Sequence, residues 1–240
     1  MPTPLPPVPV LSHGFLGFVR QGPIVYFRNV ERALRADGIA PLIPPVPPAA
    51  SIAGRAEALA RILDARGDAS FVLFGHSMGG LDARYLAAHL DPDRRVKAVI
   101  TVGTPHRGSP VAQRFLDETG WRYKWAGRHW LPALRDLDPA IREREPIPDR
   151  PDVRYESYAA RRPANGIPWW LRAVTGPVEG ENDGMVSVAS ARWGRAHDVL
   201  TADHFELVGW SLGLPGRAAA RPFDHIPFWR RIVGEAVAEG

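Results

Sequence analysis

The chain of 240 residues contains no cysteine, which excludes disulfides, thiolate metal sites and cysteine nucleophiles together. Lysine is nearly absent as well: Lys97 and Lys124 are the only two, so arginine carries almost all the positive charge. The arginines are scattered and the formal net charge is +4, which argues against a surface for nucleic acid. No apolar run approaches the roughly 20 residues of a membrane span, so no transmembrane segment is expected.

The N-terminal segment, Met1 to Pro7, lacks a basic stretch followed by an apolar one, so it does not look like a signal peptide. We therefore expect a cytoplasmic protein, or a secreted one in a mature form without its signal peptide. The composition, 45% hydrophobic and 23% charged, is that of a soluble globular protein. The length suits one domain with a full core.

The segment Gly75 to Gly79 has the pattern G-x-S-x-G, with Ser77 at its centre. A β-prone run, 70–73, precedes it, and the apolar residues of 81–90 recur at helical spacing. The serine therefore lies on a sharp turn from strand to helix, as the nucleophile of an α/β-hydrolase does. Because a serine hydroxyl alone is a poor nucleophile, the pattern predicts a histidine base, an acid and an oxyanion hole.

Strands and helices alternate along much of the chain, which predicts an α/β-hydrolase fold: a mostly parallel sheet flanked by helices. The expected strands are 8–11, 39–43, 70–73, 95–102, 153–158 and 197–201, and the expected helices are 24–37, 51–66, 82–90, 205–212 and 227–238. The alternation stops in two aromatic segments, 110–150 and 162–177. We expect a single domain over 1–240, with these two segments forming a helical cap or lid.

The acid and the base are expected late in the chain, because α/β-hydrolases have the order nucleophile, acid, histidine. Asp183 lies in an Asn-Asp-Gly turn, and His204 follows the last expected strand, so both fit this order after Ser77. His197 begins that strand and would lie at the wrong end of the sheet. The remaining alternatives are Asp203 and Glu181 for the acid and His225 for the base.

The oxyanion hole is expected from two backbone N–H groups. One belongs to Phe15, after His13 and Gly14, and the other to Met78, where a helix dipole adds to it. The side chain of His13 is expected to be buried and structural. Substrate contacts are expected from four residues, Leu16, His76, Trp169 and Trp170.

These features predict a carboxylic ester hydrolase, a lipase or esterase that cleaves lipophilic acyl esters through an acyl-enzyme. A thioesterase or an acyltransferase would use the same triad and the same first half-reaction, and stays an alternative. A non-catalytic binding protein of this fold would be expected to lack a triad member, and none is missing.

Five segments together resemble the bacterial triacylglycerol lipase family, the true lipases of Pseudomonas and Burkholderia. They are His13-Gly14-Phe15, Gly75 to Leu81 with Arg84-Tyr85, Gly103-Thr104-Pro105-His106-Arg107-Gly108-Ser109, Asn182 to Ser187, and Asp203-His204. The resemblance implies a Ser77–Asp183–His204 triad, a Phe15/Met78 oxyanion hole and a lid after Ser109. As partners we expect a small lipophilic ester as substrate and transient contact with a lipid interface.

The chain also departs from that family. Those lipases are secreted and longer, so the lid here is expected to be shorter. Many bind calcium through an aspartate two residues after the histidine, and here that position is Glu206. The resemblance therefore leaves a calcium site at Glu206 open, and no cofactor is expected to be required.

Overall fold

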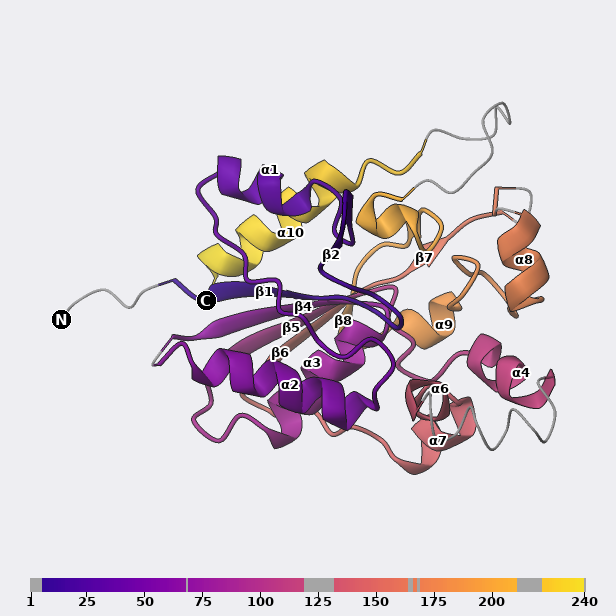
Figure 1. The fold of residues 1–240 in the computed structure, drawn as a ribbon, viewed down its shortest axis with the longest axis horizontal. Coiled ribbons are helices and arrows are strands. Elements are labelled where there is room, and N and C mark those ends of the chain that lie inside the picture. Colours follow the sequence, from indigo (N-terminus) through magenta and orange to yellow (C-terminus); the bar gives the residue numbers. More distant parts are fainter. Residues whose placement is uncertain are drawn as a thin grey trace.

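A five-stranded parallel sheet forms the centre of the computed structural model, which describes residues 6–67, 69–118, 132–163, 166–167, 169–210 and 222–239. The strand order is β1-β4-β5-β6-β8 (Figure 1). The strands are β1 (Val8–Ser12), β4 (Phe71–His76), β5 (Val96–Val102), β6 (Arg154–Tyr158) and β8 (Arg195–Ala196). All four pairings are parallel, so the expected sheet is confirmed.

The central strand β4 shows why these segments form a sheet covered on both faces. All six of its residues are buried. Successive side chains enter opposite layers: Phe71 and Leu73 pack in one apolar cluster, and Val72 and Phe74 in another. A strand with two buried faces reads as a continuous apolar run, which is what the sequence shows.

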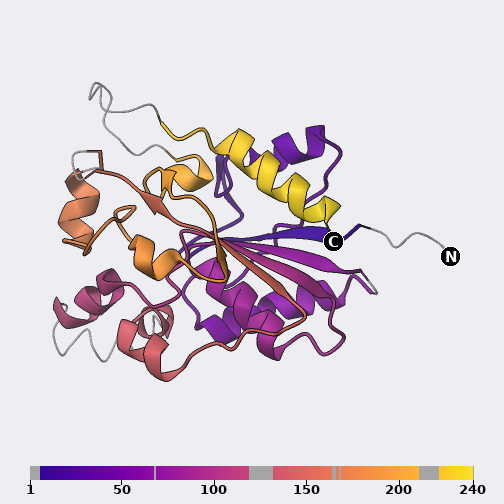
Figure 2. The same ribbon diagram turned by 180° about the vertical axis from the view of Figure 1, so that it is seen from behind.

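Two pairs of helices cover the sheet. One face carries α1 (Val30–Ala36) and α10 (His225–Ala238), and the other carries α2 (Ile52–Asp64) and α3 (Met78–His89) (Figure 1). Figure 2 shows from behind how α10 crosses the sheet. At the start of α2 the Ser51 hydroxyl accepts a hydrogen bond from the Gly54 N–H at 3.1 Å, which caps the helix.

In the described parts of the chain, five helices gather beyond the carboxyl ends of the strands (Figure 1). They are α4 (Pro110–Glu118), α6 (Pro132–Asp136), α7 (Pro139–Arg144), α8 (Trp169–Thr175) and α9 (Val188–Ala191). An apolar cluster joins Ala112 of α4 and Leu134 of α6 to Met78 and Leu81 of α3. Both expected cap segments thus contain helices, and those of 110–150 pack next to the Ser77 turn, while 119–131, 164–165 and 168 lie outside the described residues.

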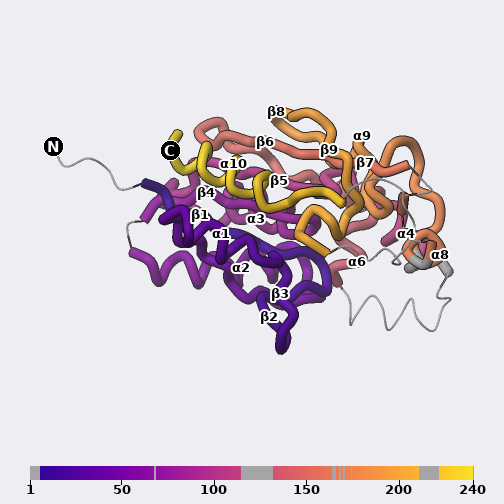
Figure 3. The backbone as a smooth tube through the Cα atoms, turned by 90° about the horizontal axis from the view of Figure 1, so that it is seen from above, coloured from indigo at the N-terminus to yellow at the C-terminus, as the bar shows by residue number. Residues whose placement is uncertain are grey.

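Short elements complete the fold. They are the antiparallel pair β2 (Arg20–Gln21) and β3 (Ile24–Val25), the parallel pair β7 (Ala160–Arg161) and β9 (Leu200–Thr201), and the 3-10 turn η1 (Glu206–Val208). Figure 3 shows the β2–β3 hairpin on the β1 side of the sheet, away from β8.

The expected helix over 24–37 is wrong in its first half. Residues Ile24–Val25 form β3, and the helix begins only at Val30, after Asn29 at φ 59°. Between them, the N–H of Arg28 bonds to the Val208 carbonyl, and Phe27 is fully buried in the core. Tertiary contacts therefore override the helical pattern in this segment.

Three of the other expected elements are also shorter than the sequence indicates. The strand expected over 39–43 is a single bridge between Leu42 and Val10, because the neighbouring prolines have no N–H to extend a ladder. Of the strand expected over 197–201, only Leu200–Thr201 form a strand, β9, and β8 ends before the expected strand begins. The helix expected over 205–212 is the turn η1, ended by Gly209 at φ 91°, and 211–212 lies outside the described residues.

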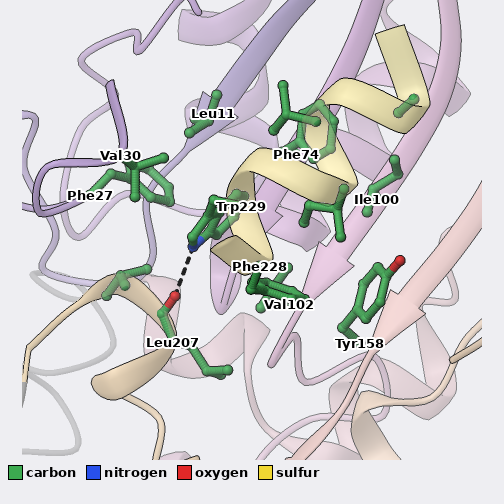
Figure 4. Close-up of a cluster of buried hydrophobic side chains, with 14 of the residues drawn as sticks. Leu11, Phe27, Val30, Phe74, Ile100, Val102, Tyr158, Leu207, Phe228 and Trp229 are labelled. Atoms are coloured by element: carbon green, nitrogen blue, oxygen red, sulfur yellow. Dashed lines mark hydrogen bonds between the residues drawn. The ribbon is translucent and has the colours of Figure 1, made fainter. Parts of the chain in front are cut away.

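The core under α10 is built around Trp229, which is 0% exposed (Figure 4). Its ring meets Phe27 and Phe74 edge-on at centroid distances of 5.3 and 6.4 Å. Its indole Nε1–H donates to the Leu207 carbonyl at 2.8 Å. Because Leu207 follows His204 by three residues, this hydrogen bond ties the histidine loop to the core.

We expect Trp229→Phe to lower the free energy of unfolding by about 1–3 kcal/mol, because it leaves the buried Leu207 carbonyl without a donor. Urea denaturation measures this change. The matched control is Trp169→Phe, because Trp169 is 61% exposed, and its effect is expected within about 0.5 kcal/mol. Equal effects of the two changes would contradict the role given to the indole.

Candidate active site

The turn between β4 and α3 holds Ser77 in an unusual backbone conformation, φ 56° and ψ −131°. A positive φ at a residue other than glycine costs of order 1–3 kcal/mol and persists only where the surrounding structure enforces it. Within Phe71–Arg84, Ser77 alone is not buried. The turn therefore exposes one hydroxyl at the carboxyl edge of the sheet.

The glycines on either side of Ser77 are required by close packing. A Cβ on Gly75 would lie 2.2 Å from the Gly80 nitrogen, and one on Gly79 would lie 2.3 Å from the Ser12 carbonyl oxygen. No side chain fits at either position. Glycine thus lets α3 start directly against β4 and β1.

Asp183 and His204 form a buried pair. The distance from His204 Nδ1 to Asp183 Oδ2 is 2.7 Å. The other carboxylate oxygen accepts the N–H groups of Met185 and Val186 at 2.9 and 2.7 Å, and the His204 N–H donates to the Asp183 carbonyl. Because a carboxylate only accepts, Nδ1 carries the proton, and Nε2 is left to act as a base.

The other candidates for acid and base have different partners. The Asp203 carboxylate accepts the N–H groups of Phe205 and Glu206 within its own turn. Glu181 is 58% exposed and pairs with Arg161. His225 contacts the Arg28 carbonyl, and His197 contacts Glu156 in a cavity of about 350 Å³ under α10. Asp183 is therefore the carboxylate that the structure brings to His204.

One expected oxyanion donor, Phe15, lies on the loop after β1, and the other, Met78, directly follows Ser77. Leu16, at φ 53°, donates its N–H to the Pro48 carbonyl at 2.8 Å, which fixes the loop after β1. Met78 is the first residue of α3. In the described parts of the chain, neither the Phe15 nor the Met78 N–H donates to a protein acceptor. Both are available to an oxyanion.

Arg55 supports this loop and was not recognised from the sequence. It is fully buried, and its guanidinium donates to the His13 carbonyl at 2.5 Å, to the Pro47 carbonyl at 2.9 Å and to Asp82 Oδ2 at 2.8 Å. A signal was present: Arg55 lies three residues after Ile52 and four before Leu59, on the apolar face of α2. An arginine at such a position needs buried acceptors.

The Gly103–Ser109 segment supports the loop that carries Asp183. The Ser109 hydroxyl donates to the Met185 carbonyl at 2.8 Å, and the Arg107 N–H donates to the Ser190 hydroxyl. His106 is buried, and burial and neighbouring Arg84 hold its pKa well below the usual value, so its ring is neutral. The segment thus holds the loop of Asp183 in place by hydrogen bonds.

The four expected substrate residues lie in different environments. Leu16 and Trp169 are 58% and 61% exposed, whereas the side chain of Trp170 lies outside the described residues. The expectation for His76 is corrected: it is 1% exposed, and its ring nitrogens are bonded to the Tyr26 hydroxyl and the His204 carbonyl. Both of its ring nitrogens therefore have partners within the protein and do not face a substrate.

The surroundings of Glu206 do not fit calcium. Arg162 binds both carboxylate oxygens, with N–O distances of 2.9, 2.8 and 2.6 Å, and the Asp203 N–H adds a contact at 2.9 Å. Calcium takes six or more oxygen ligands, and a guanidinium next to it would repel it. Among the residues described, no group of three or more His, Cys, Asp or Glu side chains is arranged to hold a metal.

The sheet, its covering helices and the serine turn make up the α/β-hydrolase fold. A family model described as alpha/beta hydrolase fold matches residues 44–135. A solved carboxyl esterase from a metagenome has the same fold, with a TM-score of 0.72 and 21% identity, over 99% of this chain and 77% of that chain. The chain thus has the α/β-hydrolase fold, and its segment 44–135 matches the model of that fold.

Its sequence relatives include triacylglycerol lipases. The chain is 28% identical over 209 residues to triacylglycerol lipase 2 of Saccharomyces cerevisiae, covering 78% of this chain and 63% of that protein. It is 35% identical over 109 residues to a triacylglycerol lipase of Pseudomonas fragi, covering 44% and 36%. The chain therefore spans less than two thirds of the length of either relative.

Asp82 gives the site a pH-dependent stability. Burial raises the pKa of this carboxyl to about 7, although Arg55 acts against the rise, whereas the unfolded pKa is about 3.9. The folded protein therefore binds this proton more tightly than the unfolded chain does. The stabilisation that results is complete below pH ~4 and is lost as the pH rises through ~7. Asp82→Asn keeps an acceptor for Arg55 and does not titrate.

We expect the free energy of unfolding of Asp82→Asn, relative to wild type, to increase between pH 4 and 7, by at most about 1.4 kcal/mol per pH unit. Urea denaturation at several pH values measures it. A difference between the two proteins that does not change with pH would contradict the raised pKa.

Chelation of divalent cations by EDTA is expected to leave both the melting temperature and hydrolysis unchanged. Arg162→Gln removes the guanidinium that pairs with the Glu206 carboxylate. It is expected to lower the free energy of unfolding by about 3–5 kcal/mol. The control is Arg161→Gln, whose partner Glu181 is exposed, with an expected loss below about 1 kcal/mol. A melting temperature that falls with EDTA and recovers with calcium would contradict this account of Glu206.

Proposed function

We propose that the protein is a serine carboxylic ester hydrolase that cleaves lipophilic acyl esters with Ser77, His204 and Asp183. The observation that carries the proposal is the buried Asp183–His204 pair at the same edge of the sheet as Ser77, which is only partly buried. His76, the neighbour of Ser77, is bonded to the His204 carbonyl at 3.1 Å, which keeps the two loops together.

The reaction begins when Ser77 Oγ attacks the ester carbonyl and His204 Nε2 accepts its proton. Asp183 stabilises the imidazolium, and the Phe15 and Met78 N–H groups bind the oxyanion. One such donor is worth about 3 kcal/mol. The imidazolium then protonates the departing alkoxide, which leaves an acyl ester on Ser77.

Water completes the cycle. His204 Nε2 takes a proton from water as the water oxygen attacks the acyl carbon. The second tetrahedral intermediate collapses, the bond to Ser77 Oγ breaks, and Oγ recovers the proton from His204. The products are the alcohol and the carboxylic acid, and the enzyme is regenerated.

A lipophilic acyl group is the substrate class that the surroundings favour. Leu16 exposes an apolar side chain next to Phe15, and Trp169 exposes another on α8. Triacylglycerol lipases and a carboxyl esterase are similar to this chain. We propose that α4, α6, α7 and α8 form the cap over the acyl group, and that the segments shared with the bacterial true lipases reflect membership of that family.

We propose that the protein contacts lipid transiently, at the surface of a lipid phase. In the described part of the chain, no helix combines the length and apolarity of a membrane span. The exposed Leu16 and Trp169 side chains suit transient contact with a lipid surface. The cellular location, cytoplasmic or secreted in a mature form, stays a prediction.

Hydrolysis of p-nitrophenyl esters with acyl chains from C2 to C16 tests the proposal. Ser77→Ala is expected to lower kcat by at least about 1,000-fold, since the nucleophile is lost. The matched control is Ser70→Ala, just before β4, with kcat within about twofold of wild type. Wild-type rates for Ser77→Ala would refute the proposal.

The same assay tests the acid and the substrate class. Asp183→Asn should lower kcat by about 100- to 10,000-fold, because an amide favours the wrong histidine tautomer, whereas Glu181→Gln should have no effect. A rate maximum at long chains supports a lipase, and one at short chains an esterase. Faster cleavage of the matching thioesters would instead favour a thioesterase.

A further inference from the structure

Tyr26 joins the loop of the proposed oxyanion hole to the Ser77 turn. Its hydroxyl accepts the Gly14 N–H at 2.9 Å and lies 2.8 Å from Nδ1 of His76. His76 Nε2 lies 3.1 Å from the His204 carbonyl oxygen. One chain of hydrogen bonds therefore runs through the three loops that carry Phe15, Ser77 and His204.

The direction of every hydrogen bond in this chain is fixed. A carbonyl oxygen only accepts, so His76 Nε2 must donate to His204. In a neutral ring, Nδ1 then accepts, and the Tyr26 hydroxyl donates to it. The hydroxyl oxygen remains free to accept the Gly14 N–H, so each group has the partner it needs.

Both side chains are held in the required neutral form. Burial and the neighbouring His204 hold the pKa of His76 well below its usual value. Burial raises the pKa of Tyr26 to about 12. Both groups are therefore neutral near pH 7, which is the form that this hydrogen-bond pattern requires.

The loop that Tyr26 holds lies against the nucleophile. A Cβ on Gly14 would lie 2.8 Å from both the Ser77 Cβ and the Tyr26 hydroxyl oxygen. Space for the Gly14 backbone is therefore limited on both sides. The peptide whose N–H Tyr26 binds comes directly before the peptide that carries the Phe15 N–H, so this hydrogen bond and the close packing of Gly14 together restrict the direction of the Phe15 N–H.

We propose that Tyr26 and His76 are positioning residues that align the Phe15 N–H, Ser77 and His204 with one another. The inference rests on the proposed function. It goes further by giving a role to two side chains whose polar atoms are bonded to other groups of the protein. Their effect is on transition-state binding, because only the tetrahedral intermediate needs the aligned donor.

Tyr26→Phe removes the hydroxyl and keeps the ring. We expect kcat to fall by about 10- to 100-fold, less than for complete loss of an oxyanion donor, with KM changed by no more than about threefold. Binding of a trifluoromethyl ketone, which forms a tetrahedral adduct with the serine, should weaken by a similar factor. The matched control is Tyr85→Phe on α3, which should alter neither kcat nor inhibitor binding.

His76 variants provide a second measurement. Gln at position 76 retains a donor for the His204 carbonyl, whereas Leu does not, so His76→Gln should keep several-fold more of kcat than His76→Leu. If the chain acts as a unit, Tyr26→Phe combined with His76→Leu should lose little more activity than His76→Leu alone. Fully additive losses would overturn the inference.

The outcomes separate this inference from the proposed function. Wild-type kcat and inhibitor affinity for Tyr26→Phe, with Ser77→Ala inactive, would overturn the positioning role and leave the hydrolase proposal intact. An active Ser77→Ala would overturn both. A loss for Tyr26→Phe that follows the folded fraction, with unchanged inhibitor affinity per folded molecule, would show a structural role and overturn the inference.

Discussion

The backbone of Ser77 is the constraint on which the site depends. Its conformation is unfavourable by itself, and it persists because β4, α3 and β1 approach so closely that Gly75 and Gly79 have no room for a side chain. The Ser77 N–H also donates to the Val102 carbonyl of β5 at 3.0 Å. Formation of the turn is therefore inseparable from assembly of the three neighbouring strands.

Buried polar groups hold the loops around this turn. Arg55 donates to the His13 carbonyl, Arg162 binds Glu206 just after His204, and Ser109 donates to the Met185 carbonyl in the loop that carries Asp183. Buried ion pairs contribute little to net stability, because desolvation offsets their attraction. Here their directional hydrogen bonds restrict each loop to one arrangement, which a site built from separate segments requires.

Sequence reasoning succeeded where the information was local. The run before Ser77, the glycines around it and the Asn-Asp-Gly turn at Asp183 each specify their own conformation. It failed at 24–37, where Tyr26 and Phe27 have distant partners. It also predicted that His76 contacts the substrate. The sequence does not show that both ring nitrogens of His76 are bonded to groups inside the protein.

The sequence by itself indicated a mostly parallel sheet, the strand-to-helix turn at Ser77 and the positions of Asp183 and His204 later in the chain, because these follow from periodicity, short-range geometry and chain order. Only the tertiary structure decided which carboxylate meets His204, what Glu206 binds and how Tyr26 enters the site. Each of these depends on contacts between residues 20 to about 130 positions apart. Such contacts form only when the sheet brings the carboxyl ends of its strands together, and no local pattern records them.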